Sequence, residues 1–403
     1  MNLTSKIRPP LRPAGRGPRA ALTAALAIGL AASGTGTALA AGAAPAAAAA
    51  PAARLAGGVA SGVALGAGRV ASRAAVPWRR VGPGWLLAEV WNGRFAEQGK
   101  PKAAPAILYL VDPAGGRYRL YRWASTKTPP YLSDWSGDKS RALVTTSTGS
   151  LEQITLASGR VSRFQLAGQA SAIAYTRPDG LNILGWRSAG SRYRLARYTT
   201  AGALARTLVT GPDAASAVYA SDGDRLAVGA NRGLQLVSNG GGVIRALHAS
   251  GTNCSPARWW DAGTILASCA SANGRPRLWL VPASGARARA LTPARGSHSP
   301  DFGDLDAWRL PSGLYLQAAG ACGTVQVFRQ AANGSIRLIK IPHASGNNRI
   351  LTADGARLLI GSPDGCNPGE TVLWFNPASH AVHVLFKSGV LGAVPYGRPT
   401  AGI

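Results

Sequence analysis

Short apolar runs recur along the chain after residue 76, and each follows a glycine-containing turn by a few residues. The turns are Pro83-Gly84, Ser136-Gly137, Asp179-Gly180, Asp222-Gly223, Ala262-Gly263, Ser312-Gly313 and Asp354-Gly355. Their glycines are 53, 43, 43, 40, 50 and 42 residues apart. The runs are short and Gly or Pro interrupts them throughout, so the pattern predicts β-strands and leaves little room for helices.

A second turn falls inside each of these units, just after another apolar run. These second turns lie at Gly116, Gly159, Gly202, Gly241, Gly285, Gly334 and His380. Two hairpin turns in a unit of this size imply four antiparallel strands, which is the size of a propeller blade. Residues 76–403 are therefore predicted to form an all-β, seven-bladed β-propeller of four-stranded antiparallel blades. A pair of β-sandwiches is the competing fold, but it does not explain a near-constant interval.

Two of the repeats carry a resemblance to known proteins. The segments Tyr219-Ala-Ser-Asp-Gly-Asp-Arg-Leu-Ala-Val228 and Thr352-Ala-Asp-Gly-Ala-Arg-Leu-Leu-Ile360 resemble the TolB-like and WD40-like β-propellers of the bacterial envelope, particularly secreted actinobacterial members. The chain lacks the paired Gly-His and Trp-Asp signatures of true WD40 repeats. The resemblance implies a non-catalytic binding platform, although many functions share this fold.

The N-terminal region has the organisation of an export signal. Basic residues precede an apolar run from Ala20 to Ala32, and Ala38-Leu39-Ala40 has the small-x-small pattern of a cleavage site. The segment Ser33-Gly34-Thr35-Gly36-Thr37 makes the run too short for a membrane-spanning helix. We therefore expect residues 1–40 to be a signal peptide and residues 41–75, rich in Ala, Gly and Pro, to be a linker. The mature chain is expected to be secreted or associated with the cell wall, without a transmembrane segment.

Composition adds a strong positive charge to this picture. The 403 residues include 44 Lys and Arg against 17 Asp and Glu, a formal net charge of +27. An exported protein rarely meets nucleic acid, and no nucleic-acid-binding motif is present, so we expect none as a partner. Envelope proteins or anionic wall polymers are the expected partners of a monomer.

Four cysteines in an exported chain favour disulfide bonds over a metal site, because their spacing fits no metal motif. Cys254 and Cys269 lie symmetrically about the turn at Asp261-Ala262, so they would face each other across a hairpin. Cys322 and Cys366 fall in equivalent loops of neighbouring repeats. We predict the bonds Cys254–Cys269 and Cys322–Cys366, and no cofactor.

A basic residue follows each second turn by three or four positions, in the predicted outermost strand. This basic belt consists of Arg119, Arg163, Arg206, Arg245, Arg289 and Arg337, with His383 in the last repeat. A charge on an edge strand deters strand addition by another chain, which is a structural role. A positive girdle could instead attract polyanions such as wall polymers or phospholipid headgroups. The sequence leaves both interpretations open.

Large aromatic residues precede the first turns, in the predicted innermost strands. They are Trp78, Trp135, Tyr175, Tyr219, Trp259 and Trp308. Packing between blades and stacking on carbohydrate are both compatible with this placement. In the pair Trp259-Trp260 only one ring can be buried on a given face of a strand.

The densest polar segment is Gly296–Asp306, which contains His298, Asp301, Asp304 and Asp306. Three carboxylates could hold a cation or supply acid and base for sugar cleavage, whereas Asp beside Gly is also ordinary turn chemistry. No nucleophile elbow or metalloprotease motif is present. The candidate binding residues are Arg258, Trp259, His298, Asp301, Asp304 and Asp306, with no catalytic or metal-binding residue assigned.

The sequence thus predicts an exported, non-catalytic propeller that serves as a binding scaffold in the cell envelope. The alternative is a propeller-fold enzyme that acts on polysaccharide, as a glycoside hydrolase or a lyase.

Overall fold

The computed structural model describes residues 68–94, 102–189, 192–211, 216–296, 302–320, 324–363 and 369–397. All of these residues belong to one compact unit, Ser61–Ile403. They form 28 β-strands and two short 3-10 helices, η1 (Arg73–Ala75) and η2 (Trp78–Arg80), and within these ranges there is no α-helix. The prediction of an all-β fold is confirmed.

One eight-stranded sheet contains both the first and the last strand of the described chain. Its order is β1-β4-β3-β2-β28-β27-β26-β25. The strands are β1 (Val70–Ser72), β2 (Leu86–Trp91), β3 (Ala104–Val111), β4 (Arg117–Thr126), β25 (Arg349–Asp354), β26 (Arg357–Pro363), β27 (Glu370–Phe375) and β28 (Val382–Pro395).

Strand β28 pairs with two neighbouring strands, β27 and β2. Near its start Val382 pairs with Phe375 of β27, and at its end Pro395 pairs with Leu86 of β2, both in antiparallel register. The last strand of the chain therefore joins the C-terminal hairpins to the N-terminal ones.

Three sheets have four strands each, in chain order. They consist of β5 (Tyr131–Trp135), β6 (Arg141–Thr145), β7 (Leu151–Thr155) and β8 (Val161–Phe164); β9 (Ser171–Tyr175), β10 (Asn182–Ala189), β11 (Arg192–Thr199) and β12 (Leu204–Gly211); and β21 (Asp304–Leu310), β22 (Gly313–Ala319), β23 (Val325–Gln330) and β24 (Ile336–Leu338). Each is built from antiparallel hairpins, as the paired turn signals predict.

The remaining sheet has eight strands in two consecutive sets. These are β13 (Ala217–Tyr219), β14 (Arg225–Ala230), β15 (Gly233–Ser238), β16 (Val243–Leu247), β17 (Thr252–Asp261), β18 (Thr264–Ala270), β19 (Pro276–Pro282) and β20 (Arg289–Ala290). The order is β16-β15-β14-β17-β18-β19-β20, with β13 also paired to β14. A single residue pair, Ala230 with Cys254, connects β14 to β17.

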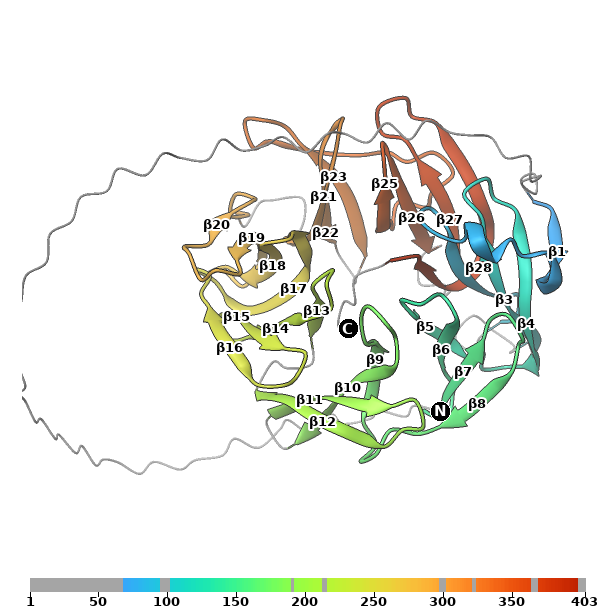
Figure 1. Ribbon diagram of the computed structural model, residues 1–403. Helices are drawn as coiled ribbons and strands as arrows, with labels where there is room; N and C mark the ends of the chain where they lie inside the picture. The colour runs from blue at the N-terminus through green and yellow to red at the C-terminus, as the bar shows by residue number, and fades with distance from the viewer. Residues whose placement is uncertain are drawn as a thin grey trace, which may run out of the picture. The chain divides into compact units, whose positions relative to one another are not determined.

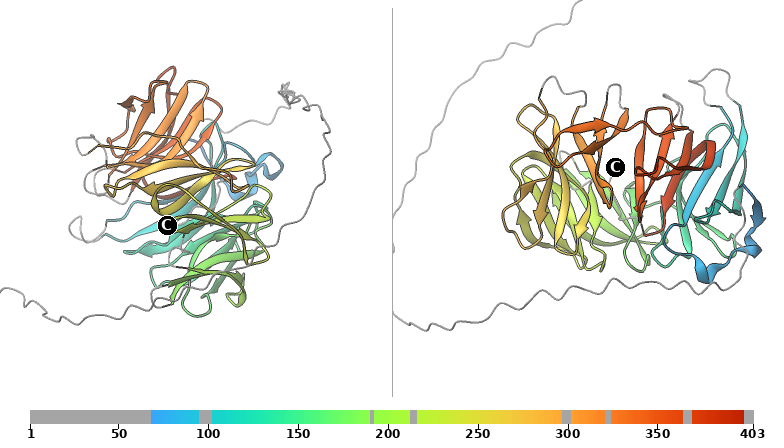
Figure 2. Two further views of the ribbon diagram at one scale, coloured as in Figure 1. Left: turned by 90° about the vertical axis from the view of Figure 1, so that its left-hand side faces the viewer. Right: turned by 90° about the horizontal axis from the view of Figure 1, so that it is seen from above.

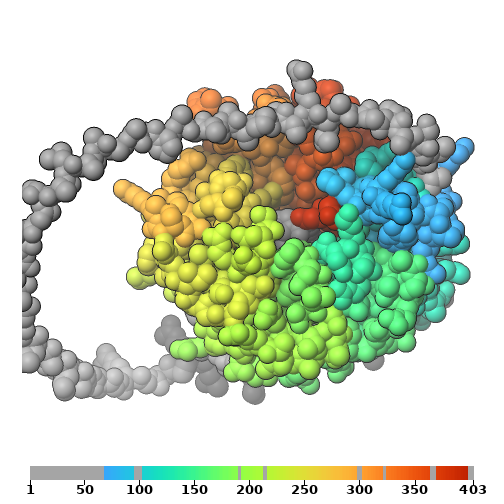
Figure 3. Space-filling model, in the orientation of Figure 1, coloured from blue at the N-terminus to red at the C-terminus, as the bar shows by residue number. Residues whose placement is uncertain are grey.

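Within this unit the sheets follow one another in chain order around a common centre (Figures 1 and 2). The space-filling view shows the same circular order of the described elements (Figure 3). The core lies between neighbouring sheets: Leu87 of β2, Leu132 of β5 and Val394 of β28 belong to one buried cluster, and Leu266 of β18 and Leu316 of β22 belong to another. Apolar faces of adjacent sheets therefore cover each other, which is how the short apolar runs stabilise the fold.

Three details differ from the predictions. Trp78 lies in η2, because the end of β28 occupies the position next to β2 that a strand around Trp78 was expected to take. The turn residue with positive φ before β4 is Gly115 instead of Gly116. Residues Val70–Ser72, assigned to the linker, form β1, which pairs in parallel with β4.

Candidate functional site

The basic belt lies where the repeat pattern placed it, on the last strand of each set of hairpins. All six arginines are exposed, on β4, β8, β12, β16, β20 and β24: they are Arg119, Arg163, Arg206, Arg245, Arg289 and Arg337. Five of these strands are at the edge of their sheet, but β4 is covered by β1, and Arg119 pairs with Ser72. Edge protection therefore does not explain Arg119. His383 pairs with Trp374 inside the sheet and is half-buried.

Most of the belt arginines have no acidic partner among the described residues. Arg163 Nε lies 2.8 Å from Glu152 Oε1, and this hydrogen bond raises the pKa of the Arg163 guanidinium. The other five arginines have no carboxylate partner within the part of the chain that the structure describes. Their charges are available to a partner in solution, because an exposed guanidinium without a carboxylate keeps its electrostatic field unneutralised.

Two belt arginines reach the next set of strands. A Cβ placed on Gly241, in the turn before β16, would lie 3.0 Å from Arg206 Nε. A Cβ on Gly285, in the turn before β20, would lie 2.9 Å from Arg245 Cδ. The aliphatic stems of these arginines thus pack on the neighbouring turn, while their side chains remain exposed.

Asp304 and Asp306 are both engaged with arginines. Asp304 is fully buried at the start of β21, and its Oδ1 accepts a hydrogen bond of 2.8 Å from Arg295 Nη2. Asp306 forms an ion pair with Arg258 of β17. The guanidinium of Arg258 also lies 3.5 Å above the ring of Trp308. These carboxylates therefore link β21 to β17 and to the segment after β20 instead of lining an open site.

Burial changes the ionisation of this arginine. Removal of the Arg258 guanidinium from water lowers its pKa, and the neighbouring Asp306 carboxylate opposes that effect. The pair is a half-buried contact between sheets, so the loss of one partner would leave an uncompensated and only partly solvated charge on the other.

Trp259 and Trp260 face opposite sides of β17, as expected for neighbouring strand residues. Trp259 packs in the cluster between β13 and β17, and its Nε1 donates a hydrogen bond of 3.4 Å to the carbonyl of Val218. Trp260 packs in the cluster that includes β22 and lies beneath Arg309, 5.6 Å from ring centre to guanidinium. Both rings are half-buried between sheets, which favours the packing interpretation.

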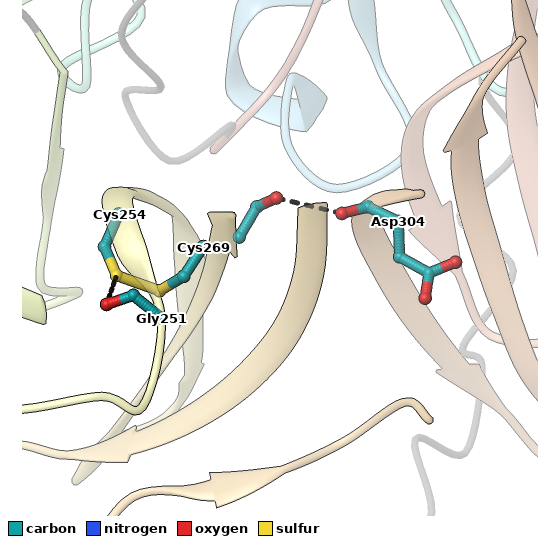
Figure 4. The surroundings of a disulfide bond; sticks show 5 residues. Gly251, Cys254, Cys269 and Asp304 are labelled. Carbon is teal, nitrogen blue, oxygen red and sulfur yellow. Dashed lines mark hydrogen bonds between the residues drawn. A yellow bond between two sulfur atoms is a disulfide. The ribbon is translucent and has the colours of Figure 1, made fainter. Parts of the chain in front are cut away.

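The structure contains the disulfide Cys254–Cys269, the pairing expected from the symmetric placement of the two cysteines (Figure 4). The bond joins β17 to β18, with the Cα atoms 4.1 Å apart. Beside it, the Ser268 hydroxyl donates a hydrogen bond of 2.9 Å to the carbonyl of Asp304. Cys322, Cys366, His298 and Asp301 lie outside the described residues.

A buried carboxyl that the sequence analysis did not single out lies between β2 and β5. Glu89 is fully buried, and its Oε2 accepts a hydrogen bond of 2.6 Å from the Leu132 amide. Its Oε1 has no hydrogen-bond partner in the described structure. Burial raises the pKa of Glu89 to about 8, against the lowering effect of the Leu132 bond. A charged residue inside the apolar run Leu86–Trp91 was the available signal.

Equivalent bridges occur between other sheets. Gln317 of β22 accepts a hydrogen bond of 2.8 Å from the Ile350 amide, and Asp134 of β5 accepts one of 2.8 Å from the Tyr175 amide. Polar side chains at the boundaries between sheets thus satisfy backbone groups that would otherwise be buried without a partner.

The described residues contain no group of three or more His, Cys, Asp or Glu that could bind a metal ion. A search of the same residues finds no helix with the length and apolarity needed to cross a bilayer.

Antiparallel sheets that follow one another around a centre define an all-β protein of the propeller class. No protein-family model matches the chain, and no curated protein matches it. Among solved structures, a puromycin-hydrolysing peptidase of Mycobacterium tuberculosis is similar over 70% of this chain and 49% of its own, at 16% identity and a TM-score of 0.50. A prolyl endopeptidase is similar over 72% of this chain and 48% of the endopeptidase chain, at 14% identity and a TM-score of 0.50.

TolB of Acinetobacter baumannii is similar over 79% of this chain and 65% of its own, at 10% identity and a TM-score of 0.41. The chain spans about half the length of the two peptidase chains, and under two thirds of that TolB chain. At these identities the likeness shows the fold alone.

Proposed function

We propose that the protein is an exported, non-catalytic propeller that acts as a binding scaffold in the cell envelope and holds anionic wall polymers on its outer edge. The observation that carries this proposal is the exposure of five belt arginines without a carboxylate partner in the described chain. A line of unneutralised positive charge attracts an anionic polymer more strongly than it attracts a neutral polymer. Envelope proteins with acidic surfaces are the other partners that the belt could take.

The scaffold would consist of seven four-stranded blades. Six blades follow chain order from β5 to β28, and the seventh combines the end of β28 with β2, β3 and β4. The pairing of β28 with both β27 and β2 supports this assignment, because it supplies the first blade with its innermost strand from the end of the chain. We expect this unit to be a monomer.

Export is supported by the organisation of residues 1–40 and by the disulfide Cys254–Cys269, since disulfides persist in oxidising compartments. The mature chain would then be secreted or held at the cell wall. The bond Cys322–Cys366 remains part of this proposal.

The alternative, an enzyme that cleaves polysaccharide, requires carboxylates that converge on an open site. Asp304 and Asp306 are instead committed to Arg295 and Arg258. Two of the three carboxylates that this alternative needs are thus held in ion pairs, and this favours the binding scaffold.

The test measures binding of the full chain to a glycerol-phosphate polymer of defined length. The variant Arg119→Gln/Arg289→Gln/Arg337→Gln removes three belt charges that have no carboxylate partner among the described residues. The control Arg141→Gln/Arg225→Gln/Arg357→Gln removes three arginines that pair with Asp138, Asp222 and Asp354, and so lowers the net charge equally.

We expect the belt variant to bind about tenfold more weakly at low salt, and the control to differ from the wild type by about twofold or less. Binding of the wild type should decline steeply as sodium chloride rises, because salt screens exposed charges. Equal losses in both variants, or binding that salt does not affect, would refute a role for the belt.

A further inference from the structure

Large exposed apolar side chains gather on two neighbouring edge strands of the belt. Eight such side chains are exposed in the described chain, and three of them are on β12 and β16: Leu204 at 47%, Val243 at 48% and Ile244 at 52%. In both strands the first four residues are all exposed. Aliphatic surface of this kind is costly in water unless something covers it.

The turn that leads into β16 lies against β12. The Gly242 amide, directly before Val243, donates a hydrogen bond of 3.0 Å to the carbonyl of Leu208 in β12. Arg206 of β12 packs against Gly241 in the same turn. We call Leu204, Arg206, Val243, Ile244 and Arg245 the β12–β16 strip.

The strip combines aliphatic and positively charged side chains. Arg206 and Arg245 are exposed and have no carboxylate partner among the described residues, and neither strand contains an acidic residue. The strip also contains no aromatic residue. A hydrated polymer gains from the arginines but not from Val243 or Ile244, whereas a bilayer offers anionic headgroups and acyl chains together.

We propose that the β12–β16 strip binds the surface of an anionic lipid bilayer. Arg206 and Arg245 contact lipid phosphates, and Leu204, Val243 and Ile244 enter the boundary between headgroups and acyl chains. The proposal rests on the function proposed above only in that export brings the protein to an envelope membrane. It assigns a partner to one part of the belt, whereas wall polymers engage the belt generally.

The experiment measures flotation of the full chain with vesicles of phosphatidylcholine and phosphatidylglycerol, beside vesicles of phosphatidylcholine alone. One variant, Leu204→Thr/Val243→Thr/Ile244→Thr, keeps the charge and removes the aliphatic surface. A second variant, Arg206→Gln/Arg245→Gln, removes the charge and keeps the aliphatic surface. The control Arg337→Gln/Leu338→Thr changes the same residue types on β24, where Leu338 is also exposed.

We expect the aliphatic variant to partition about tenfold more weakly into anionic vesicles, from the loss of apolar burial. In the arginine variant, the partition coefficient into anionic vesicles should fall about fivefold for each charge removed. The β24 control should remain within about twofold of the wild type, because it leaves the β12–β16 strip intact. In high salt some wild-type binding to anionic vesicles should persist, since burial of aliphatic side chains is not screened.

The glycerol-phosphate polymer separates this inference from the proposed function. The aliphatic variant should bind the polymer as the wild type does. If the wild type binds the polymer but does not float with anionic vesicles, the lipid assignment is overturned in favour of a protein partner, and the scaffold proposal stands. If the aliphatic variant floats as well as the wild type, the strip is not a membrane contact, and thermal melting of each variant excludes misfolding as the cause of any loss.

Discussion

Each turn that leads into a fourth strand has a residue at positive φ at the same position. These residues are Gly115, Gly159, Gly202, Gly241, Gly285, Gly334 and His380. Six of the seven are glycine, because side-chain Cβ atoms clash with the backbone in this conformation. The recurrence of glycine at this turn position is visible in the sequence, and it predicted where the turns lie. His380 adopts φ 58° without being glycine, so the turn persists even where the residue type disfavours it.

Substitution of Gly202 should cost more stability than substitution of Gly334. Both have positive φ, but a Cβ on Gly202 would lie 2.0 Å from the carbonyl oxygen of Gln165, whereas nothing lies within 4 Å of one on Gly334. We expect Gly334→Ala to lower the free energy of unfolding by about 1 kcal/mol through backbone strain alone. Gly202→Ala should cost about 3 kcal/mol, because rigid backbone must also move. Urea denaturation of both variants checks this, and equal losses would contradict it.

Protonation of Glu89 should make stability depend on pH. Burial favours the neutral carboxyl, so the folded chain keeps a proton that the unfolded chain releases near its ordinary pKa of 4.5. The stabilisation is complete below that value and is lost as pH rises to about 8, the pKa in the folded state. Over this window the free energy of unfolding should fall by up to about 1.4 kcal/mol per pH unit.

The variant Glu89→Gln should remove this dependence, because an amide does not titrate there and can still accept from the Leu132 amide as Gln317 accepts from Ile350. The measurement is the difference in unfolding free energy between wild type and Glu89→Gln from pH 4 to pH 9. If the unfolding free energies of the two proteins changed with pH in parallel, protonation of Glu89 would be excluded as the cause of the pH dependence.

At the scale of strands, the contacts between sheets depend on partners far apart in the chain. Asp306 forms an ion pair with Arg258, and the Ser268 hydroxyl donates a hydrogen bond to the carbonyl of Asp304. The sequence showed that carboxylates cluster between residues 301 and 306, and this clustering suggested a ligand site. It could not show that Arg258 of an earlier strand pairs with Asp306, because such pairing depends on how neighbouring sheets are placed and not on local spacing. The cysteine pair was easier to predict, since the hairpin that joins Cys254 to Cys269 is local.

Removal of the charge on Asp306 should destabilise the protein more than removal of an exposed ionic partner. We expect Asp306→Asn to lower the free energy of unfolding by about 2 kcal/mol, because it leaves the half-buried Arg258 guanidinium without its counterion. The matched change Asp222→Asn, in the exposed pair with Arg225, should cost about 1 kcal/mol or less.

The double variant Arg258→Met/Asp306→Asn should recover part of the loss, since no half-buried charge then remains unpaired. Calorimetric melting of the three variants provides the comparison. A double variant less stable than Asp306→Asn would show that the ion pair matters for a reason other than desolvation.

For the whole molecule, the repeat interval predicted a propeller, and the sheets that surround a common centre agree with it. The sequence did not predict how the ends of the chain meet. Trp78 was placed on an innermost strand because it precedes the first turn, as aromatic residues do in the other repeats. The structure fills that position with the end of β28, since main-chain pairing can use any strand that presents a suitable edge and apolar face.

Loss of the end of β28 should therefore abolish cooperative folding. Truncation after Ser388 removes the buried side chains of Val390, Leu391, Ala393 and Val394 and exposes the edge of β2. Burial of the three larger side chains contributes several kcal/mol, on the order of the entire stability of a typical domain. Truncation after Gly397, which removes none of the described strands, is the control. A cooperative thermal transition in the shorter protein, at the temperature of the control, would contradict this role of β28.

The short strand β1 has a mechanical consequence. Its three residues lie parallel to β4, and Arg73 behind them donates a hydrogen bond of 3.0 Å to the Leu120 carbonyl. Tension applied through the N-terminal end of the chain would act first on the hydrogen bonds of β1 and on the contact of Ala71 with the buried cluster of Leu87. β1 would then detach before the other strands, while β4 keeps its pairing with β3.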